Sequence, residues 1–369
     1  MVLKVGFLTR DWSVPPPFSA VPGGCAYYRC YLPMVVCRHR GQMGLPVFNA
    51  AHGFGCIEDV TVGAYGFDVV VLKLIMDRGL PAQIRLAQKN VGQKIIIDID
   101  DYFDGLTPAN RAYQITDPAR NTKFNREHYR RSIEIADAVT VSTPFLYDYY
   151  SCMRDNVYMI RNGVNMHQFR PRVHSPGKPI IGWAGAVAFR NNDLEQLREW
   201  LPDLLEKHDL MFHHVGATGD QISDIAGIPK HRLITSPLTT IKNYGPALQF
   251  DIGLVPLNDI PFNVAKSNIK GLEYAAAGIP FIASDMPEYR LLHETGVGTI
   301  ASTPDEWTLA VERLLDHRER KKEAHRASMA VLKAWTIEHR ASDWNEVLTT
   351  VASSGSGDKT STHPYQPSH

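Results

Sequence analysis

The chain has 369 residues, of which 44% are hydrophobic and 21% are charged, which excludes a long disordered chain and a collagen-like one. Its length predicts two or three domains. Lys plus Arg and Asp plus Glu number 39 each, so the balanced charge excludes a grip of the whole surface on DNA or on an anionic membrane, but not a local basic patch.

Short apolar runs rich in Val and Ile alternate with amphipathic stretches along the chain. Such runs are typical of buried parallel strands, and we predict strands at 3–8, 68–72, 94–98, 138–142, 157–160, 179–183, 210–215, 232–235, 251–256 and 280–283. Helical spacing predicts helices at 81–90, 121–136, 192–208, 304–334 and 336–351. Strands that alternate with helices predict an α/β fold of parallel sheets.

This pattern runs twice, and a Pro- and Gly-rich stretch near 165–177 separates the two halves. We therefore expect an N-terminal domain at 1–165, a C-terminal domain at 166–335 and a last helix at 336–352. Residues 353–369 are rich in Ser, Gly, Thr, Pro and His, and we expect a disordered tail there.

The N-terminal segment 1–8 is apolar but short, and Arg10 and Asp11 follow it, which indicates a first strand and not a signal peptide. No apolar run reaches the roughly 18 residues that a membrane helix needs. The spacings of the five cysteines match no metal motif, and free thiols are typical of a reducing compartment. They are Cys25, Cys30, Cys37, Cys56 and Cys152. We expect a cytoplasmic protein without a membrane span.

A glycine pair, Gly23 and Gly24, precedes a predicted helix in the loop after the first strand. Glycines at a helix start let backbone N–H groups approach a phosphate, and the helix dipole favours the anion. The alternative is an ordinary turn. The sequence contains neither G-x-G-x-x-G nor a Walker motif, which disfavours a dinucleotide oxidoreductase and a P-loop protein.

Four acidic residues follow the apolar run 95–97: Asp98, Asp100, Asp101 and Asp104. Crowded carboxylates need partners or a purpose. They either bind acceptor hydroxyls or act as a base, or they bind Mg²⁺ beside an Asp nucleophile, since the segment resembles the motif of haloacid dehalogenase phosphatases. Tyr102 departs from that motif. The third alternative is a solvated acidic loop.

A basic stretch follows at 120–131, with Arg126, Arg130 and Arg131 among its cations. A charge run of this kind is typical of a solvated helix face. The alternative is a binding surface for an acidic acceptor.

The C-terminal half holds two segments suited to a diphosphate. Gly185 closes a Gly-x-x-Gly turn after a strand, and Arg190 follows near a helix start. Lys266 and Lys270 share one face near the start of another helix, which Ser267 or Asn268 would cap. Glu273 is placed one turn further, where it suits ribose hydroxyls. The alternative for one Lys–Glu pair is a surface ion pair.

The segment 266–284 resembles the donor-binding segment of family 4-like glycosyltransferases with the GT-B fold. Residues 182–185, 161–165 and 23–24 resemble the start of the C-terminal domain, the hinge and the N-terminal glycine loop of that family. The resemblance implies two Rossmann-like domains that face a cleft, with a C-terminal helix that crosses back to the first domain. It also implies a nucleoside-diphosphate sugar, with UDP or GDP, as donor, no bound metal or cofactor, and retention of anomeric configuration.

This sequence departs from the family pattern at Ala265, where the first of two glutamates is expected. A subgroup with the pattern Lys-Ser-x-x-Lys works without that acid. Residues 98–106 and 141–146 also look like glycosyltransferases encoded by actinobacterial phages, which implies the host cytoplasm. The acceptor would then be a virion protein or modified DNA.

We therefore predict a glycosyltransferase that transfers a sugar from a nucleotide sugar to a hydroxyl of a protein, of modified DNA or of a glycan. The predicted catalytic residues are Asp98, Asp100, Asp101 and Lys266. The predicted donor-binding residues are Gly23, Gly24, Gly185, Arg190, Lys266, Ser267, Lys270 and Glu273. Two alternatives stay open, a sugar-nucleotide epimerase of the same fold and a non-catalytic scaffold that binds a nucleotide sugar.

Overall fold

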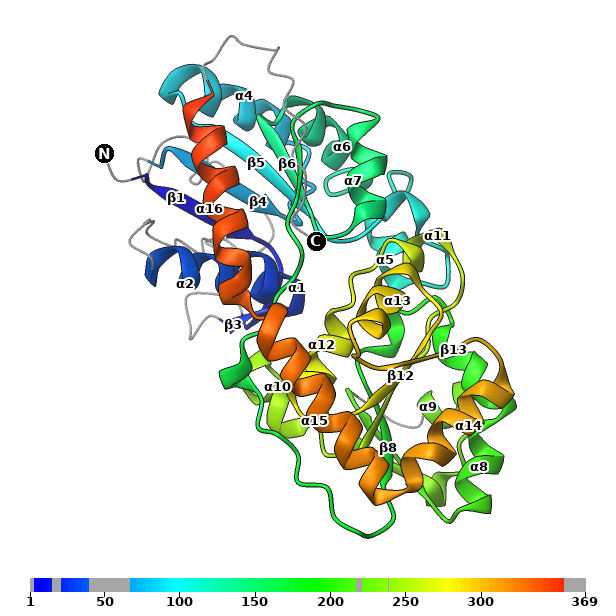
Figure 1. The fold of residues 1–369 in the computed structure, drawn as a ribbon. Coiled ribbons are helices and arrows are strands. Elements are labelled where there is room, and N and C mark those ends of the chain that lie inside the picture. The colour runs from blue at the N-terminus through cyan, green and yellow to red at the C-terminus, as the bar shows by residue number, and fades with distance from the viewer. Residues whose placement is uncertain (1–2, 15–20, 40–66, 217–220, 238, 355–369) are drawn as a thin grey trace. The chain divides into compact units, whose positions relative to one another are not determined.

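A computed structural model describes residues 3–14, 21–39, 67–216, 221–237 and 239–354 (Figure 1). The chain divides into two compact units. The first unit comprises Met1–Asp104, Gln114–Asn162 and Ile337–His369, and the second comprises Gly105–Tyr113 and Gly163–Thr336. Cys56 and nearly all of the tail predicted to be disordered lie outside the described residues.

The first unit is built on a parallel sheet of five strands in the order β1-β4-β5-β6-β7. The strands are β1 (Val5–Thr9), β4 (Val69–Lys73), β5 (Lys94–Ile99), β6 (Ala138–Val141) and β7 (Val157–Met159). The register pairs Thr9 with Lys73, Lys73 with Asp98, and Asp98 with Thr140. A row of polar side chains therefore crosses four strands near their carboxyl ends.

Helices accompany this sheet along the chain. They are α1 (Gly24–Ala26), a π-helical turn η1 (Tyr27–Tyr31), α2 (Leu32–His39), α4 (Leu80–Val91), the turn η2 (Phe103–Gly105), α6 (Arg126–Ile135), α7 (Pro144–Ser151) and α16 (Ile337–Ser353). The last helix, red in Figure 1, belongs to the first unit. Its Trp344 is buried edge-on against Phe7 with 5.8 Å between ring centroids, so the expected return of the C-terminal helix to the first domain is confirmed.

The second unit has a parallel sheet of six strands in the order β10-β9-β8-β11-β12-β13. The strands are β8 (Ile180–Ala184), β9 (Met211–Val215), β10 (Leu233–Ser236), β11 (Ile252–Val255), β12 (Phe281–Ser284) and β13 (Thr299–Ala301). Counted within the unit, the order is 3-2-1-4-5-6, that of a doubly wound Rossmann sheet. The strand order reverses between β8 and β11, which is where such sheets bind ligands, beyond the carboxyl ends of the strands.

The helices of this unit follow or precede its strands. They include α8 (Leu201–Lys207), α9 (Gln221–Ala226), α10 (Ile241–Ala247), α11 (Pro261–Val264), α12 (Ile269–Ala276), α13 (Pro287–Glu294), α14 (Pro304–Leu315) and α15 (His317–Ala334). A further helix, α5 (Arg111–Thr116), lies where the chain passes from the second unit back to the first. Within the described residues, we find no helix whose length and apolar character would let it span a bilayer.

The ten predicted strands are confirmed, with ends that differ by one or two residues. Two predicted helices are each divided. The stretch 192–208 forms a 3-10 helix, Asp193–Glu199, and then α8, because Pro202 lacks an N–H and starts a new helix. The stretch 304–334 divides at Asp316, whose side chain accepts hydrogen bonds from two backbone N–H groups and so caps α15.

Candidate active site

The predicted donor-binding residues of the second unit follow the two strands at its switch point. Gly185 comes directly after β8, and Arg190 ends the short turn Val187–Phe189 that follows. Helices α11 and α12 come after β11, so Lys266 and Lys270 reach the same edge of the sheet from the other strand. The topology alone therefore brings both segments to the place where doubly wound sheets bind ligands.

Gly185 has a φ of 154°, a conformation that side chains disfavour. A Cβ atom there would lie 2.9 Å from the Trp183 ring and 3.0 Å from Nη2 of Arg190. The missing side chain leaves room for the Arg190 guanidinium, which lies over the Trp183 ring at 5.3 Å from its centroid. Nε of Arg190 is buried and lacks a hydrogen-bond partner among the described residues.

Lys270, Glu273 and Tyr244 form a hydrogen-bonded triad between α12 and α10. Nζ of Lys270 donates to the Tyr244 hydroxyl at 2.8 Å and to Oε2 of Glu273 at 3.1 Å, and Tyr244 donates to the same oxygen at 2.8 Å. Glu273 is buried. The Lys–Glu pair is thus no surface ion pair. Each of the three side chains is hydrogen-bonded to the other two in this structure.

The cations of the second unit gather closely enough to disturb one another. Burial is the main cause that lowers the pKa of Lys270; Glu273 opposes the shift, and the charges of Arg190 and Lys266 add to it. Nζ of Lys266 lies 4.3 Å from the centroid of the Phe262 ring. Three cations and one carboxylate leave a net positive charge, which a bound anion would stabilise.

The start of α12 differs from the predicted cap. Asn268 is the N-cap residue, but its side chain makes no capping hydrogen bond and donates to the backbone oxygen of Glu288 at 3.2 Å. Ser267 precedes it and is half-buried. Ala265, where the family's first glutamate would fall, is fully buried.

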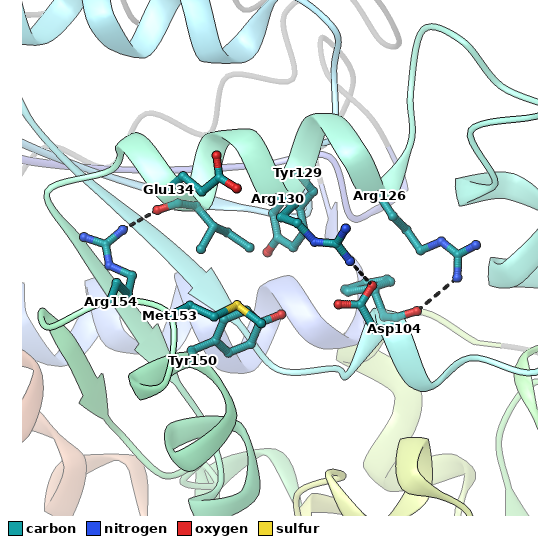
Figure 2. Close-up of a pocket in the computed structure, with 10 residues that line it drawn as sticks. Asp104, Arg126, Tyr129, Arg130, Glu134, Tyr150, Met153 and Arg154 are labelled. Atoms are coloured by element: carbon teal, nitrogen blue, oxygen red, sulfur yellow. Dashed lines mark hydrogen bonds and ion pairs between the residues drawn. The ribbon is translucent and has the colours of Figure 1, made fainter.

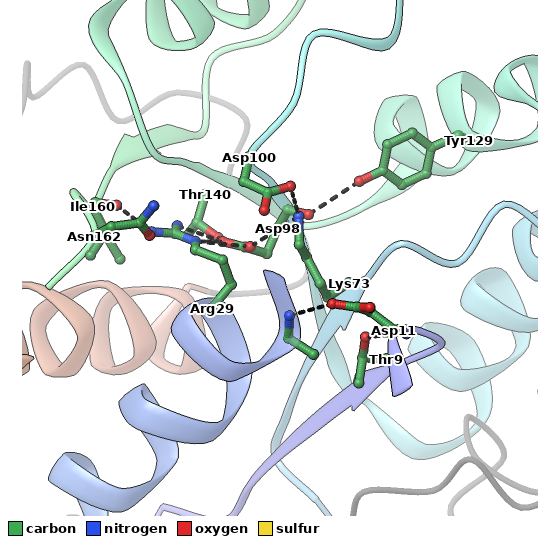
Figure 3. A network of polar contacts seen from close by, with 11 residues as sticks. Thr9, Asp11, Arg29, Lys73, Asp98, Asp100, Tyr129, Thr140, Ile160 and Asn162 are labelled. Atoms are coloured by element: carbon green, nitrogen blue, oxygen red, sulfur yellow. Dashed lines mark hydrogen bonds and ion pairs between the residues drawn. The ribbon is translucent and has the colours of Figure 1, made fainter. Parts of the chain in front are cut away.

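In the first unit the polar row of the sheet forms a buried network (Figure 3). Asp98 is 0% exposed and accepts hydrogen bonds from Arg29 at 2.6 and 3.1 Å and from Thr140 at 2.7 Å. Nη1 of Arg29 also donates to the backbone oxygen of Ile160 at 2.5 Å. Asp98, one of the predicted catalytic residues, is therefore shielded from solvent in this structure.

Lys73 lies inside the same network and forms an ion pair with Asp100, while Oδ2 of Asp98 is 3.9 Å from its Nζ. Asp101 follows and is half-buried. Ligand atoms of Cys25, Asp100 and Asp101 lie within 4.8 Å of one another. Burial raises the pKa of the Cys25 thiol, and the charge of Asp100 raises it further.

The predicted glycine loop, at Gly23 and Gly24, packs against the carboxylate of Asp11, an anion of the same chain. Gly23 donates its N–H to the backbone oxygen of Asp11 at 2.9 Å, and Ala26 donates its N–H to the Asp11 carboxylate at 2.8 Å. A Cβ atom on Gly23 would fall 1.8 Å from that carboxylate, so the first glycine is needed for this contact. A Cβ atom on Gly24 would meet nothing within 4 Å.

Two residues of these clusters were not predicted from the sequence, Lys73 and Tyr244. Lys73 ends an apolar strand. A charged residue directly after four apolar ones was the sequence feature that could have indicated a functional or paired lysine. Tyr244 lies in α10, and no pattern in the sequence indicates that α10 packs beside α12. Arg29, which follows the glycine pair in the sequence, donates to the Asp98 carboxylate.

Solved structures with the same fold include two that span nearly the whole chain. Sucrose-phosphate synthase from Thermosynechococcus elongatus has a TM-score of 0.65 at 13% identity, over 94% of this chain and 98% of that one. The Anabaena protein Alr3699/HepE in complex with UDP and glucose has a TM-score of 0.60 at 13% identity, over 94% and 100%. The predicted fold class is confirmed, since these two sheets with their helices form the GT-B fold of glycosyltransferases.

The sequence comparisons agree with this class. Residues 249–346, which contain α12, match a family described as glycosyl transferase-like. A Bacillus subtilis (strain 168) protein, TuaH, named as a candidate teichuronic acid biosynthesis glycosyltransferase, is 26% identical over 175 residues, 42% of this chain and 42% of TuaH. The chain thus spans less than half the length of this curated relative, and glycosyltransferases are the enzymes it is similar to.

Proposed function

We propose that the protein transfers a sugar from a nucleoside-diphosphate sugar, in the first place a UDP-sugar, to an acceptor hydroxyl. The observation that carries the proposal is the cluster of Arg190, Lys266 and Lys270 at the switch point of the second unit. A diphosphate carries a negative charge on each phosphate, which suits this cluster. The UDP in the HepE structure supports the choice of base.

The proposed roles follow from charge and position. Arg190, Lys266 and Lys270 bind the diphosphate and stabilise the negative charge that develops on it as the glycosidic bond breaks. The unpaired Nε of buried Arg190 gains a partner when a phosphate oxygen binds. Glu273 accepts a hydrogen bond from ribose. Gly185 and Ser267 line the donor, and the reaction retains anomeric configuration, as the family resemblance implies.

The acids at the end of β5 serve the acceptor in this proposal. Asp100 and Asp101 bind the attacking hydroxyl, and the buried Asp98, held by Arg29 and Thr140, anchors the strand end that precedes them. Gly24 borders the same end of the sheet. The name of TuaH favours testing a glycan acceptor before a protein or DNA. The four described cysteines are free thiols, which fits the reducing cytoplasm as the place of reaction.

The test combines nucleotide binding with nucleotide release. UDP, GDP, ADP and TDP are compared by their effect on the thermal unfolding midpoint, since a ligand of the native state raises it. Release of the nucleotide from the matching sugar donor is then followed with an acceptor present. Formation of an isomerised donor without acceptor product would support an epimerase instead, and binding without turnover would support a scaffold.

The matched variants are Lys270→Ala and Lys242→Ala. Lys270→Ala removes a charge-assisted contact to the diphosphate, and we expect UDP affinity to fall by about tenfold to a hundredfold. Lys242 is an exposed lysine on the same helix as Tyr244 and serves as the control. Equal loss in both variants, or no loss in either, would exclude this donor site.

A further inference from the structure

The first unit contains a cavity of about 150 Å³ that lies beside α6 and the end of α7 (Figure 2). Its apolar lining comes from Phe103, Tyr129, Ile133, Tyr150 and Met153, and its charged lining from Asp104, Arg126, Arg130, Glu134 and Arg154. A cavity of this volume accommodates a six-membered ring such as benzene. Arg126 and Arg130 lie at one end beside Asp104, and Arg154 lies at the other end (Figure 2).

The guanidinium groups of the cavity keep hydrogen-bonding capacity. Nη2 of Arg130 donates to Oδ1 of Asp104 at 2.8 Å, and the fork of the guanidinium leaves further N–H groups that can donate to a ligand. Arg154 donates from Nη1 to the backbone oxygen of Ile133 and from Nη2 to that of Ala136, the latter at 2.8 Å. Its Nε is buried and lacks a hydrogen-bond partner among the described residues.

The charge of the lining favours an anion. Three arginines oppose two carboxylates, and Asp104 is already held by Arg130 and by the Tyr149 hydroxyl at 2.8 Å. Burial lowers the pKa of Arg154, and Asp137 partly opposes this shift. A cation in such surroundings is stabilised by an anion that brings charge-assisted hydrogen bonds.

The cavity adjoins the acidic strand end. Tyr129 lines it with its ring, while its hydroxyl donates to the backbone oxygen of Asp98 at 3.1 Å. Phe103 and Asp104 follow Asp100 and Asp101 in the same loop. A molecule seated in the cavity therefore lies next to the acids to which we assign the attacking hydroxyl.

We propose that this cavity is a subsite for an anionic sugar unit of the acceptor, a pyranose ring that carries a carboxylate or a phosphate. The ring packs on Tyr150 and Met153, the anionic substituent binds Arg130 at one end of the cavity, and Arg154 at the other end donates to hydroxyl groups of the ring. The assignment to the acceptor rests on the proposed function, whereas binding of an anionic sugar here does not.

Methyl NMR of the full chain with ¹³C-methyl methionine detects a ligand in this cavity through the chemical shift of the Met153 methyl group, since Met153 lines the cavity and is 51% exposed. Met153→Leu assigns the resonance. The probes are D-glucuronate, D-glucose 6-phosphate, D-glucose and inorganic phosphate. We expect both anionic sugars to shift the Met153 signal at a concentration about tenfold lower than glucose or phosphate does. Equal binding of glucose, or of inorganic phosphate, would overturn the proposal.

Arg130→Gln and Arg131→Gln form the matched pair of variants. Arg130 is 52% exposed, so its replacement is compatible with folding, and we expect the dissociation constant of both anionic sugars to rise about tenfold. Arg131 is the exposed next residue of α6 and does not line the cavity. Unchanged binding in Arg130→Gln would exclude the subsite.

A UDP titration of the same samples separates this proposal from the proposed function. If UDP binds and no anionic sugar shifts Met153, the subsite is refuted while the donor site stands. If the anionic sugars bind and Lys270→Ala leaves their binding unchanged, the subsite is supported independently of the donor site. Loss of the Met153 shift in Lys270→Ala would place the sugars at the donor cations and refute the subsite.

Discussion

Lys73 and Asp100 form an ion pair inside the first unit, with 0% and 9% of their side chains exposed. Burial alone lowers the pKa of a lysine, but the carboxylates of Asp100 and Asp98 outweigh it and raise the pKa of Lys73 above its ordinary value. The lysine is thus charged at neutral pH. Its charge lies directly beneath the acids proposed to bind the acceptor.

Lys73→Met should lower the free energy of unfolding by about 3–5 kcal/mol, because it leaves Asp100 with an unpaired, buried charge. The double variant Lys73→Met/Asp100→Asn should recover part of this loss, since no charge then lacks a partner. Urea unfolding of the two single variants and the double variant measures the coupling. Purely additive losses would show that the pair contributes no coupling.

The sign of the pKa shift fixes the pH range of this effect. A lysine whose pKa is raised by folding contributes stability that is complete below its unfolded pKa, about 10.4, and lost as pH rises through its folded pKa. The penalty of Lys73→Met should therefore be the same at about pH 6 and about pH 9. A penalty that disappears toward about pH 9 would contradict the raised pKa.

Asp101→Asn should lower the rate of transfer by about tenfold or more while UDP affinity stays unchanged, because the acid belongs to the first unit and the donor cations to the second. Asp100→Asn should act in the same direction with an added loss of stability. Steady-state transfer and UDP titration measure the two effects separately. Asp148→Asn, an exposed acid on α7, is the control. Collapse of UDP affinity in Asp101→Asn would assign the acid to the donor instead.

Groupings of residues that are close in the sequence could be predicted better than groupings that arise when distant segments pack together. Lys270 and Glu273 lie one turn apart on α12, and Lys266 lies in the short connection before that helix, so their grouping could be predicted from their spacing in the sequence. The row of Lys73 and Asp98 arises from the register of strands that are distant in sequence. No single strand reveals that register, and so Asp98 was grouped with Asp100 and Asp101 although it is fully buried inside the network.

Asp251, at the start of β11, offers a pH test in the second unit. It accepts hydrogen bonds from Nε of Arg172 at 2.7 Å and from the Ile180 N–H at 2.9 Å, and Nδ1 of His174 lies 3.6 Å away. Burial opposes ionisation, but these groups outweigh it and lower the pKa of Asp251 well below its ordinary value. A depressed pKa contributes stability above the unfolded pKa that is lost as pH falls through the folded pKa.

Asp251→Asn should therefore reduce the free energy of unfolding at about pH 7 by on the order of 2 kcal/mol, and the difference from the original protein should shrink below about pH 4. Urea unfolding over this range measures it. Asp259→Asn, an exposed acid after the same strand, should show a much smaller difference at every pH. A difference that grows as the pH falls would reverse the assigned direction of the shift.

Gly185→Ala tests whether the glycine turn positions Arg190. The φ of 154° is unfavourable for alanine, and the new Cβ would press on the Trp183 ring and on Arg190, so we expect a loss of about 1–3 kcal/mol in stability. UDP affinity should fall as well, because the guanidinium must leave the ring. Gly177→Ala is the control, since a Cβ atom there meets nothing within 4 Å. If Gly185→Ala lost stability but kept full UDP affinity, the turn would serve folding alone. The assignment of Arg190 to the donor site would then be wrong.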